Sequence, residues 1–265
     1  MRGAVDLLSR APYDNVYLQW LIESGESAPN ATLNVALTPD GEMCGVAYEG
    51  AQLVLAGDDA AIRAFALTLG KKSPQPRMIV SPRPLVELFW SIAKGHFPVP
   101  SAIRRSQPVY ALVRADLVTH AGEPGIARAT SAEAGEIVRE AARMAARELM
   151  GGGDPERIDP VFRARTEARI EAGRVWRYRL ADGKLVFQCD IGSFTAQTAQ
   201  VQGVWTPLDA RGRGYATRGF AAICDRLLDE HPSLCLFVND FNREAIALYE
   251  RVGFKRAGEF ASVLF

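Results

Sequence analysis

The 265-residue sequence has no excess of either charge, because 31 lysines and arginines balance 31 aspartates and glutamates. Without a basic excess, the chain has no global field that would attract nucleic acid or an anionic membrane surface. It also lacks a stretch of about 20 apolar residues that could span a bilayer, and its N-terminal residues lack the continuous apolar core of a signal peptide. We therefore expect a cytoplasmic protein that binds neither nucleic acid nor membranes.

Metal-binding and disulfide patterns are also scarce. The cysteines and histidines show neither CxxC nor HExxH spacing. They are Cys44, Cys189, Cys224, Cys235, His96, His120 and His231. Free cysteines within apolar runs behave as small hydrophobic residues. The sequence therefore gives no reason to predict a metal site.

The first part of the chain alternates short strands with helices. Residues 39–41, Pro-Asp-Gly, lie between two apolar runs and predict a hairpin turn. Asp58 can cap a helix that Gly70 would end. The expected order is helix 14–23, strands 32–37, 42–48 and 52–56, helix 58–69, strand 77–80, helix 84–94 and strand 109–114.

A break follows at residues 120–125, whose sequence His-Ala-Gly-Glu-Pro-Gly is rich in turn-forming residues. This composition, after a complete α/β pattern, predicts a boundary between a domain of residues 1–120 and a domain of residues 126–265. A surface loop within a single domain would have the same composition.

The second part begins with helical patterns and continues with strands. Thr130 and Glu133 form a capping-box pattern, and Asp182-Gly183 indicates a hairpin. The expected elements are helix 131–150, a helix from Asp154 toward Gly173 that Pro160 resets, strands 175–180, 184–193 and 199–206, helix 214–230, strand 234–238, helix 243–252 and strand 259–264.

An antiparallel meander followed by β-α-β units predicts an α+β fold, with helices on both faces of a mixed, mostly antiparallel sheet. The first part of the chain repeats the later portion of this order, without sequence identity at a fixed period. We therefore expect two such domains in tandem, the first being a degenerate copy.

The segment at residues 204–217 has the clearest chemical pattern. A strand ends, a loop with Arg211, Gly212, Arg213 and Gly214 follows, and a helix begins. Backbone N–H groups at a helix N-terminus, opened by glycines and flanked by arginines, suit a pyrophosphate. A GxGxxG fingerprint and a Gly-Lys-Ser/Thr phosphate loop are both absent. A surface turn is the alternative interpretation of this loop when it is taken alone.

Together with a second segment, this loop resembles the GNAT superfamily of N-acetyltransferases, whose loop signature is Arg/Gln-x-x-Gly-x-Gly/Ala. Arg211, Gly214 and Ala216 match that signature position for position. Further along the chain, the residues that match the family's second pattern are Asn242, Ala245, Tyr249, Gly253 and Phe254. The resemblance covers residues 126–265 and implies the GNAT fold there.

The resemblance implies acetyl-CoA as co-substrate and an amine as acceptor, with direct transfer in a ternary complex. The loop would hold the pyrophosphate, and the strand before it would pair with the pantetheine arm. The implied cofactor contacts are Val204, Trp205, Thr206, Arg211, Gly212, Arg213, Gly214, Tyr215, Ala216, Thr217, Asn239 and Asn242. Asparagine is also a favoured helix cap, which is an alternative role for Asn242. The sequence leaves open whether the chain forms a homodimer.

Two residues are the candidates for proton transfer. The resemblance implies Tyr249 as the general acid for the leaving thiolate, with packing in the core as the alternative. Many family members carry Glu on the strand where this chain has Gln200 and Gln202, and glutamine cannot accept a proton usefully at neutral pH. Asp190, on the preceding strand, is then the nearest candidate base, with a solvent-facing sheet residue as the alternative.

Three functions therefore remain open. The first is an N-acetyltransferase, and the second is a non-catalytic acyl-CoA-binding or sensing protein, which the missing carboxylate motivates. The third is a tandem small-molecule transferase similar to mycothiol synthase. In the first domain, residues 57–59, Gly-Asp-Asp, stand in place of an arginine-glycine loop and would repel a pyrophosphate. We therefore expect no cofactor site there and one acyl-CoA per chain.

Overall fold

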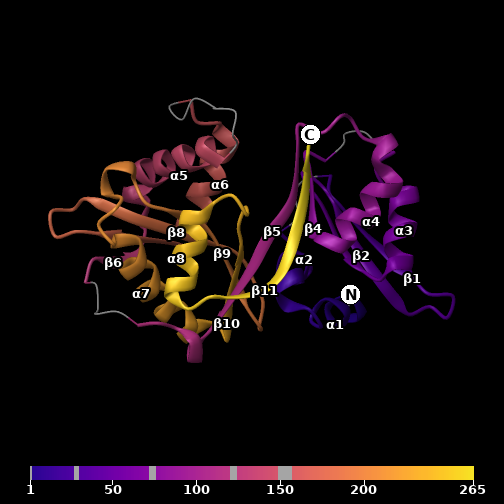
Figure 1. Cartoon of the computed structure of the whole chain (residues 1–265), viewed down its shortest axis with the longest axis horizontal. Helices are drawn as coiled ribbons and strands as arrows, with labels where there is room; N and C mark the ends of the chain where they lie inside the picture. The colour runs from indigo at the N-terminus through magenta and orange to yellow at the C-terminus, as the bar shows by residue number, and fades with distance from the viewer. Residues whose placement is uncertain (1, 27–29, 72–75, 120–123, 149–156) are drawn as a thin grey trace.

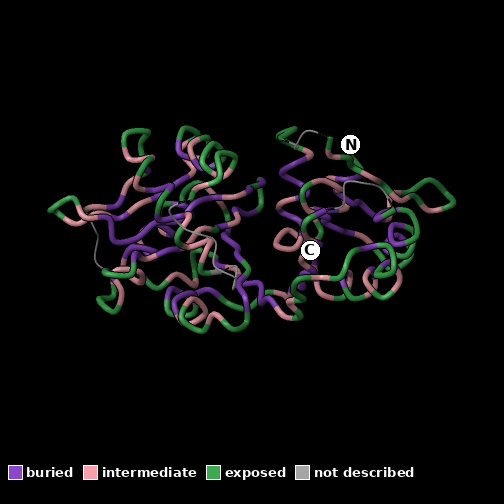
Figure 2. The backbone as a smooth tube through the Cα atoms, turned by 90° about the horizontal axis from the view of Figure 1, so that it is seen from above, coloured by how far each residue is buried: buried purple, intermediate pink, exposed green. Residues whose placement is uncertain are grey.

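The computed structural model describes residues 2–26, 30–71, 76–119, 124–148 and 157–265. These residues form two lobes in which helices pack against strands (Figure 1), and each lobe has a buried interior of its own (Figure 2). One sheet of the described residues runs through both lobes, with its strands in the order β1-β2-β3-β4-β11-β5-β10-β9-β8-β7-β6.

The elements of the first half precede residue 119. They are α1 (Arg2–Leu8), α2 (Pro12–Ser24), β1 (Thr32–Leu37), β2 (Met43–Glu49), β3 (Leu53–Gly57), α3 (Asp59–Thr68), β4 (Met78–Pro82), α4 (Arg83–Ala93), η1 (Lys94–His96), β5 (Ala102–Val113) and η2 (Arg114–Asp116).

The elements of the second half follow residue 124. They are β6 (Ile126–Arg128), η3 (Ser131–Glu133), α5 (Ala134–Glu148), α6 (Pro160–Glu171), β7 (Val175–Arg179), β8 (Leu185–Phe194), β9 (Ala199–Trp205), η4 (Leu208–Ala210), α7 (Tyr215–Glu230), β10 (Ser233–Phe237), α8 (Arg243–Val252) and β11 (Lys255–Leu264).

The sheet is mostly antiparallel. Among the described strands, β3 pairs in parallel with β4 and β9 pairs in parallel with β10, and the other neighbours are antiparallel. In both parallel pairs a helix connects the two strands, α3 in the first lobe and α7 in the second. This arrangement confirms the predicted α+β class, the mixed sheet flanked by helices, and the tandem pattern.

The two lobes exchange strands. β5 pairs with β10 of the second lobe, while β11, the last strand, pairs with β4 of the first lobe and with β5 on its other edge. Tyr110 and Leu112 of β5 lie in the core of the second lobe, whereas Ala261 and Val263 of β11 lie in the core of the first. The C-terminus therefore ends in the lobe that begins the chain (Figure 1).

The predicted domain ranges, 1–120 and 126–265, describe the order along the chain and stay a prediction. Most of the break at residues 120–125 lies outside the described residues. The exchange of β5 and β11 means that each of these ranges contributes a strand to the core of the other lobe.

Several elements differ from their predicted bounds. α1 and β6 were not expected, because a short helix and a three-residue edge strand give little periodicity to detect. β5 begins at Ala102, whereas the predicted strand began at residue 109. The prediction began too late because Arg104, Arg105 and Pro108 interrupt the apolar pattern of the strand. Proline has no N–H for a strand ladder, and β11 shifts register on either side of this point.

The helices before β7 follow their local capping signals. The predicted capping box is confirmed, because the Thr130 N–H donates to a Glu133 carboxylate oxygen at 2.9 Å. α6 begins at Pro160, with the Asp159 carboxylate accepting from the Val161 N–H at 2.7 Å. The glycine stop at residues 151–153 and the predicted helix start at 154–155 lie outside the described residues.

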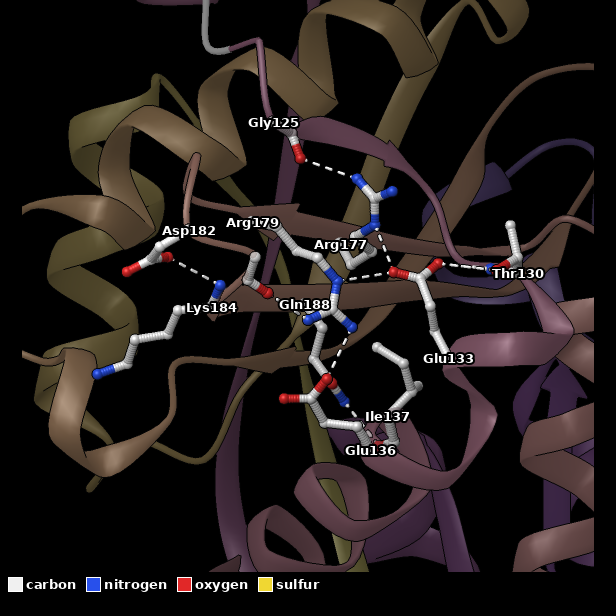
Figure 3. A network of polar contacts seen from close by, with 11 residues as sticks. Gly125, Thr130, Glu133, Glu136, Ile137, Arg177, Arg179, Asp182, Lys184 and Gln188 are labelled. Atoms are coloured by element: carbon white, nitrogen blue, oxygen red, sulfur yellow. Dashed lines mark hydrogen bonds and ion pairs between the residues drawn. The ribbon is translucent and has the colours of Figure 1, made fainter.

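Glu133, the last residue before α5, also joins this segment to strand β7 (Figure 3). One carboxylate oxygen accepts from Arg177 Nε at 2.9 Å and from Arg179 Nε at 2.7 Å. Burial alone would raise the pKa of Glu133, but the hydrogen bonds from Arg179, Thr130 and Arg177 outweigh it and lower the pKa from 4.5 to about 2. The folded state therefore binds this proton less tightly than the unfolded chain does.

We predict that Glu133→Gln lowers the free energy of unfolding at pH 7 and weakens its dependence on acid. A depressed folded-state pKa stabilises the protein above pH 4.5, and this stabilisation is lost as the pH falls from 4.5 toward 2. The contribution is on the order of 3 kcal/mol. Chemical denaturation between pH 7 and pH 3 measures it.

The control is Glu87→Gln, because Glu87 forms an exposed ion pair with Arg83, and such pairs contribute little. An identical acid dependence in the wild type and in Glu133→Gln would contradict the prediction.

Candidate functional site

The sheet opens between β9 and β10. These strands pair at only two positions, Leu234 with Ala199 and Cys235 with Gln200. Beyond these two positions β9 continues to Trp205 and β10 continues to Phe237, and the two strands form no further pairs with each other. The two strands therefore diverge toward their C-terminal ends.

β9 carries a bulge at this opening. Gln188 of β8 pairs with Trp205 and Asp190 pairs with Gln202, so the segment between them has one more residue on β9 than on β8. Gly203 lies in this segment with φ of 64°, and a Cβ there would overlap the Asp190 carboxylate. Glycine is therefore required at the bulge, which redirects the residues that follow it.

A large cavity of about 860 Å³ lies at the opening. It is lined by Met144, Arg147, Val204, Trp205, Thr206, Ala210, Arg211, Gly212, Gly214, Tyr215, Ala216, Thr217, Asn239, Phe241, Asn242, Arg243, Glu244, Ala245, Leu248 and Arg251. We call it the larger cavity. It brings together all the predicted cofactor-binding residues except Arg213, whose side chain is exposed outside it.

The N-terminus of α7 forms one wall of the larger cavity. Gly214 stands at the N-cap with φ of 74°, and no side chain of the described residues caps this helix. Gly212 also has φ of 74°, and a Cβ on it would meet no atom within 4 Å. The backbone N–H groups of the first turn are therefore accessible to a ligand, and the helix dipole favours an anion there.

Arg211 is held at this wall by three contacts. Its guanidinium lies 4.7 Å from the Trp205 ring centroid, Nε donates to the Thr206 carbonyl at 3.2 Å, and Nη1 lies 3.6 Å from a Glu244 oxygen. Burial and the positive charge of Arg147 lower the pKa of Arg211. A phosphate between the two arginines would relieve this repulsion. The wall therefore has the features of an anion-binding site.

Sequence reasoning missed several residues of the larger cavity. Arg147 comes from the last turn of α5, Phe241 from the turn before α8, and Arg243 and Arg251 from the first and last turns of α8. The α8 residues lie within the second motif, so their proximity to it was a usable signal. Nothing in the local sequence around Arg147 indicates that α5 ends beside the loop at Arg211.

The side chains of the two asparagines after β10 make different hydrogen bonds. The Asn242 side chain accepts from the Ala245 N–H at 3.2 Å, so it caps α8 while it also lines the larger cavity. The Asn239 side chain is 8 % exposed, and its Oδ1 accepts from Gln107 Nε2 at 3.0 Å. Both alternatives considered for Asn242 are therefore compatible with the structure.

A second cavity, of about 270 Å³, lies under α5 and α6. We call it the smaller cavity. Its walls include Gly203, Met144 and Asp190, and Met144 also lines the larger cavity. Since Gly203 faces one cavity and the next residue, Val204, faces the other, the two cavities adjoin across the bulge of β9.

Asp190 is a buried residue of the smaller cavity rather than a solvent-facing one. Its Oδ2 lies 2.5 Å from Arg169 Nε and accepts from Gln202 Nε2 at 3.2 Å. Gln188, on the same strand, is 4 % exposed; its Nε2 donates to the Ile137 carbonyl at 3.3 Å (Figure 3), while its Oε1 has no hydrogen-bond partner among the described residues. The cavity thus offers an unused acceptor beside a carboxylate.

Tyr249 lies in the core of the second lobe. Its ring centroid is 5.8 Å from Phe220, 6.0 Å from Phe254 and 6.3 Å from Tyr110, and the residue is 6 % exposed. Its helix neighbours Ala245 and Leu248 line the larger cavity, whereas Tyr249 is not among the lining residues found. The structure therefore does not place Tyr249 on the cavity wall with the cofactor-binding residues.

Among the described residues, no group of three or more histidine, cysteine, aspartate or glutamate side chains is arranged to hold a metal ion. None of the described helices is both long and apolar enough to cross a membrane.

The fold and the site together define an α+β protein with a splayed mixed sheet and an uncapped helix N-terminus at the opening. Comparison with known proteins agrees with this description. A family model described as FR47-like protein matches residues 191–262, and a model for a domain of unknown function, DUF4081, matches residues 35–137. A search of curated proteins finds no match.

Solved structures match along almost the whole chain. A GNAT-family acetyltransferase from Colwellia psychrerythraea has a TM-score of 0.62 at 13% identity, covering 100% of this chain and 97% of its own. A GCN5-related N-acetyltransferase from Sphaerobacter thermophilus has a TM-score of 0.62 at 17% identity, covering 98% and 90%. A tandem GNAT protein from the clavulanic acid biosynthesis pathway has a TM-score of 0.59 at 14% identity, covering 99% and 93%. The chain therefore has the GNAT fold, in its tandem form.

We predict that Gly214→Glu abolishes CoA binding while the fold is kept. The new carboxylate would stand at the N-terminus of α7, where it would repel phosphate and cover the free N–H groups. We expect affinity for CoA to fall by more than about 100-fold, measured by isothermal titration calorimetry.

The matched control is Gly183→Glu. Gly183 lies in the exposed turn between β7 and β8 with φ of 86°, so the substitution has a similar backbone cost at a residue that does not line the larger cavity. Unchanged CoA affinity in Gly214→Glu would show that the loop is not the phosphate site.

Proposed function

We propose that this protein is an N-acetyltransferase, which transfers the acetyl group of acetyl-CoA to a small amine in a ternary complex. The observation that carries the proposal is the pair of cavities that adjoin at the bulge of β9. One has a wall suited to a pyrophosphate, and the other contains a carboxylate and an unused hydrogen-bond acceptor. Two reactants bound in these cavities would meet at Gly203 and Val204.

The larger cavity has groups for each part of acyl-CoA. The N–H groups at the start of α7, with Arg211 and Arg147, would hold the pyrophosphate. The unpaired edge of β9 at Val204 and Trp205 would pair with the pantetheine arm as an added strand. The same backbone would direct an N–H toward the thioester carbonyl oxygen, where negative charge develops during transfer.

The smaller cavity would bind the acceptor. A buried amide oxygen without a partner costs free energy until a donor reaches it, so Gln188 Oε1 favours a ligand with an N–H group. Asp190 lies beside it, lines the same cavity, and is placed to take up the proton that the neutral amine nitrogen loses during transfer. The volume of about 270 Å³ favours a small amine.

The transfer forms one bond and breaks another. The neutral amine nitrogen attacks the thioester carbonyl carbon, the new C–N bond forms, and the C–S bond breaks. The nitrogen loses one proton, for which Asp190 is the candidate acceptor. The sulfur gains one, for which Tyr249 is the candidate donor that the family resemblance implies; its hydroxyl would have to reach the thiolate past Ala245 and Leu248, which line the larger cavity. The other residues of the site bind and orient the two substrates.

We infer that residues 1–120 contain no second acyl-CoA site. The Asp58 carboxylate accepts from the Ala61 N–H at 2.9 Å, so the N-terminus of α3 is already capped by an anion. A Cβ on Gly57 would meet the Cys44 carbonyl at 2.6 Å, whereas the corresponding space beside Gly212 is open. These contacts support one acyl-CoA per chain.

A non-catalytic acyl-CoA-binding protein is the second candidate. It is favoured by the absence of a carboxylate on β9 and by the contact of Asp190 with Arg169, which engages one of its oxygens. This candidate shares the larger cavity and differs in having no turnover.

The deciding experiment measures CoA release with a thiol reagent. The purified chain is incubated with acetyl-CoA and a panel of small amines, and we expect an amine-dependent release above the rate of hydrolysis. Binding of acetyl-CoA without release for any amine would favour the second candidate, and absence of binding would reject both.

We predict that Tyr249→Phe lowers kcat at least about 10-fold with little change in acetyl-CoA affinity, because it removes only the hydroxyl from a packed ring. Tyr110→Phe is the control: Tyr110 lies in the same core, and its hydroxyl donates to Glu250 at 3.0 Å. Steady-state kinetics of both variants give the comparison. Equal effects in the two variants, or full activity in Tyr249→Phe, would remove the general-acid role.

A further inference from the structure

Three buried uncharged side chains from separate parts of the chain meet beside the larger cavity. They are Asn239, two residues past the end of β10, Gln107 on β5 and Ser262 on β11, and they are 8 %, 2 % and 0 % exposed. Gln107 Nε2 donates to Asn239 Oδ1 at 3.0 Å, and the Ser262 hydroxyl donates to Gln107 Oε1. The three form a continuous hydrogen-bonded chain, which we call the relay.

The Ser262 hydroxyl sets the direction of the relay. Its proton is buried, and Gln107 Oε1 is the acceptor that the structure gives it. If the Gln107 amide were reversed, its NH2 would face Ser262 and this hydroxyl proton would lose that acceptor, at the cost of an unsatisfied buried donor. Ser262 therefore keeps the Gln107 NH2 directed toward Asn239.

The Gln107 NH2 sets the orientation of Asn239 in turn. Because Asn239 Oδ1 accepts from Gln107, the side chain has its Nδ2 N–H groups left to offer the larger cavity, which Asn239 lines. No acceptor for Nδ2 is found among the described side chains and backbone groups around it. The relay thus presents a hydrogen-bond donor at the place where β9 and β10 diverge.

We propose that Gln107 and Ser262 are positioning residues, which fix the Asn239 amide so that it donates to a carbonyl oxygen of the acyl-pantetheine arm. The arm carries amide and thioester carbonyls and no anionic group, so a neutral donor suits it better than an arginine. This inference rests on the proposed function, since it takes acyl-CoA as the ligand of the larger cavity. It also gives the first half of the chain a role in cofactor binding through β5.

The relay is tested with Ser262→Ala and Asn239→Ala, singly and combined. Each single variant should weaken acetyl-CoA binding by about 3- to 10-fold, the effect of one neutral hydrogen bond. Because Ser262 acts through Asn239, the double variant should bind no more weakly than Asn239→Ala alone. Gln107→Met, which keeps the side-chain length and removes both bonds, should match Ser262→Ala and replaces it if that variant does not fold.

Two controls separate positioning from general damage. Ser81→Ala removes another fully buried serine hydroxyl, which accepts from the Leu55 N–H on β3, and it should leave acetyl-CoA affinity unchanged. Adenosine 3′,5′-bisphosphate, which lacks the pantetheine arm, should bind the wild type and Ser262→Ala equally well.

These measurements distinguish failure of the positioning role from failure of the proposed function. Loss of affinity for both probes in Ser262→Ala, or additive effects in the double variant, would overturn the positioning role while acyl-CoA binding stands. Unchanged acetyl-CoA affinity in Ser262→Ala and Gln107→Met would do the same. A wild-type chain that binds no acetyl-CoA would overturn the proposed function and the relay with it.

Discussion

The antiparallel ladder between β5 and β11 lies at the centre of the sheet, and both lobes are built on it. β5 continues the ladder on its other edge into β10, and β11 continues it into β4. Each strand brings side chains to the core of the lobe opposite to its own half, Tyr110 and Leu112 in one direction and Ala261 and Val263 in the other. Since burial of apolar surface is the main favourable term in folding, neither half of the sequence completes its core alone.

The opening of the sheet follows from the same ladder. β10 is paired to β5 over its whole length, from Ser233 to Phe237, and to β9 at only two positions. β10 is therefore fixed by β5 along one edge, while along its other edge β9 bends away from it at the bulge at Gly203. The larger cavity lies at this divergence and adjoins the smaller one across the bulge of β9, and the proposed meeting of thioester and amine depends on this arrangement.

Much of this architecture could be predicted from the chain order and from local signals. The turn at residues 39–41, the Asp58 cap and the Thr130–Glu133 capping box each indicate an element that the structure contains. The predicted strand for β5 is too short, because Pro108 and two arginines do not alternate with apolar residues. In the structure, pairing on both edges stabilises the whole strand. Long-range pairing overrides a weak local preference there.

The local chemistry of the site can be derived from the sequence alone: the accessible helix start after Gly214, the Asn242 cap and the glycines with positive φ. These features depend on neighbouring residues and on the backbone conformations that they permit. The folded arrangement of distant segments is what brings Arg147 close to Arg211, buries Asp190 beside Gln188, and links Ser262 and Gln107 to Asn239 by hydrogen bonds. Hydrophobic periodicity shows which face of a strand is buried, but not which strands pair, so contacts between residues far apart in the chain arise only when the sheet is assembled.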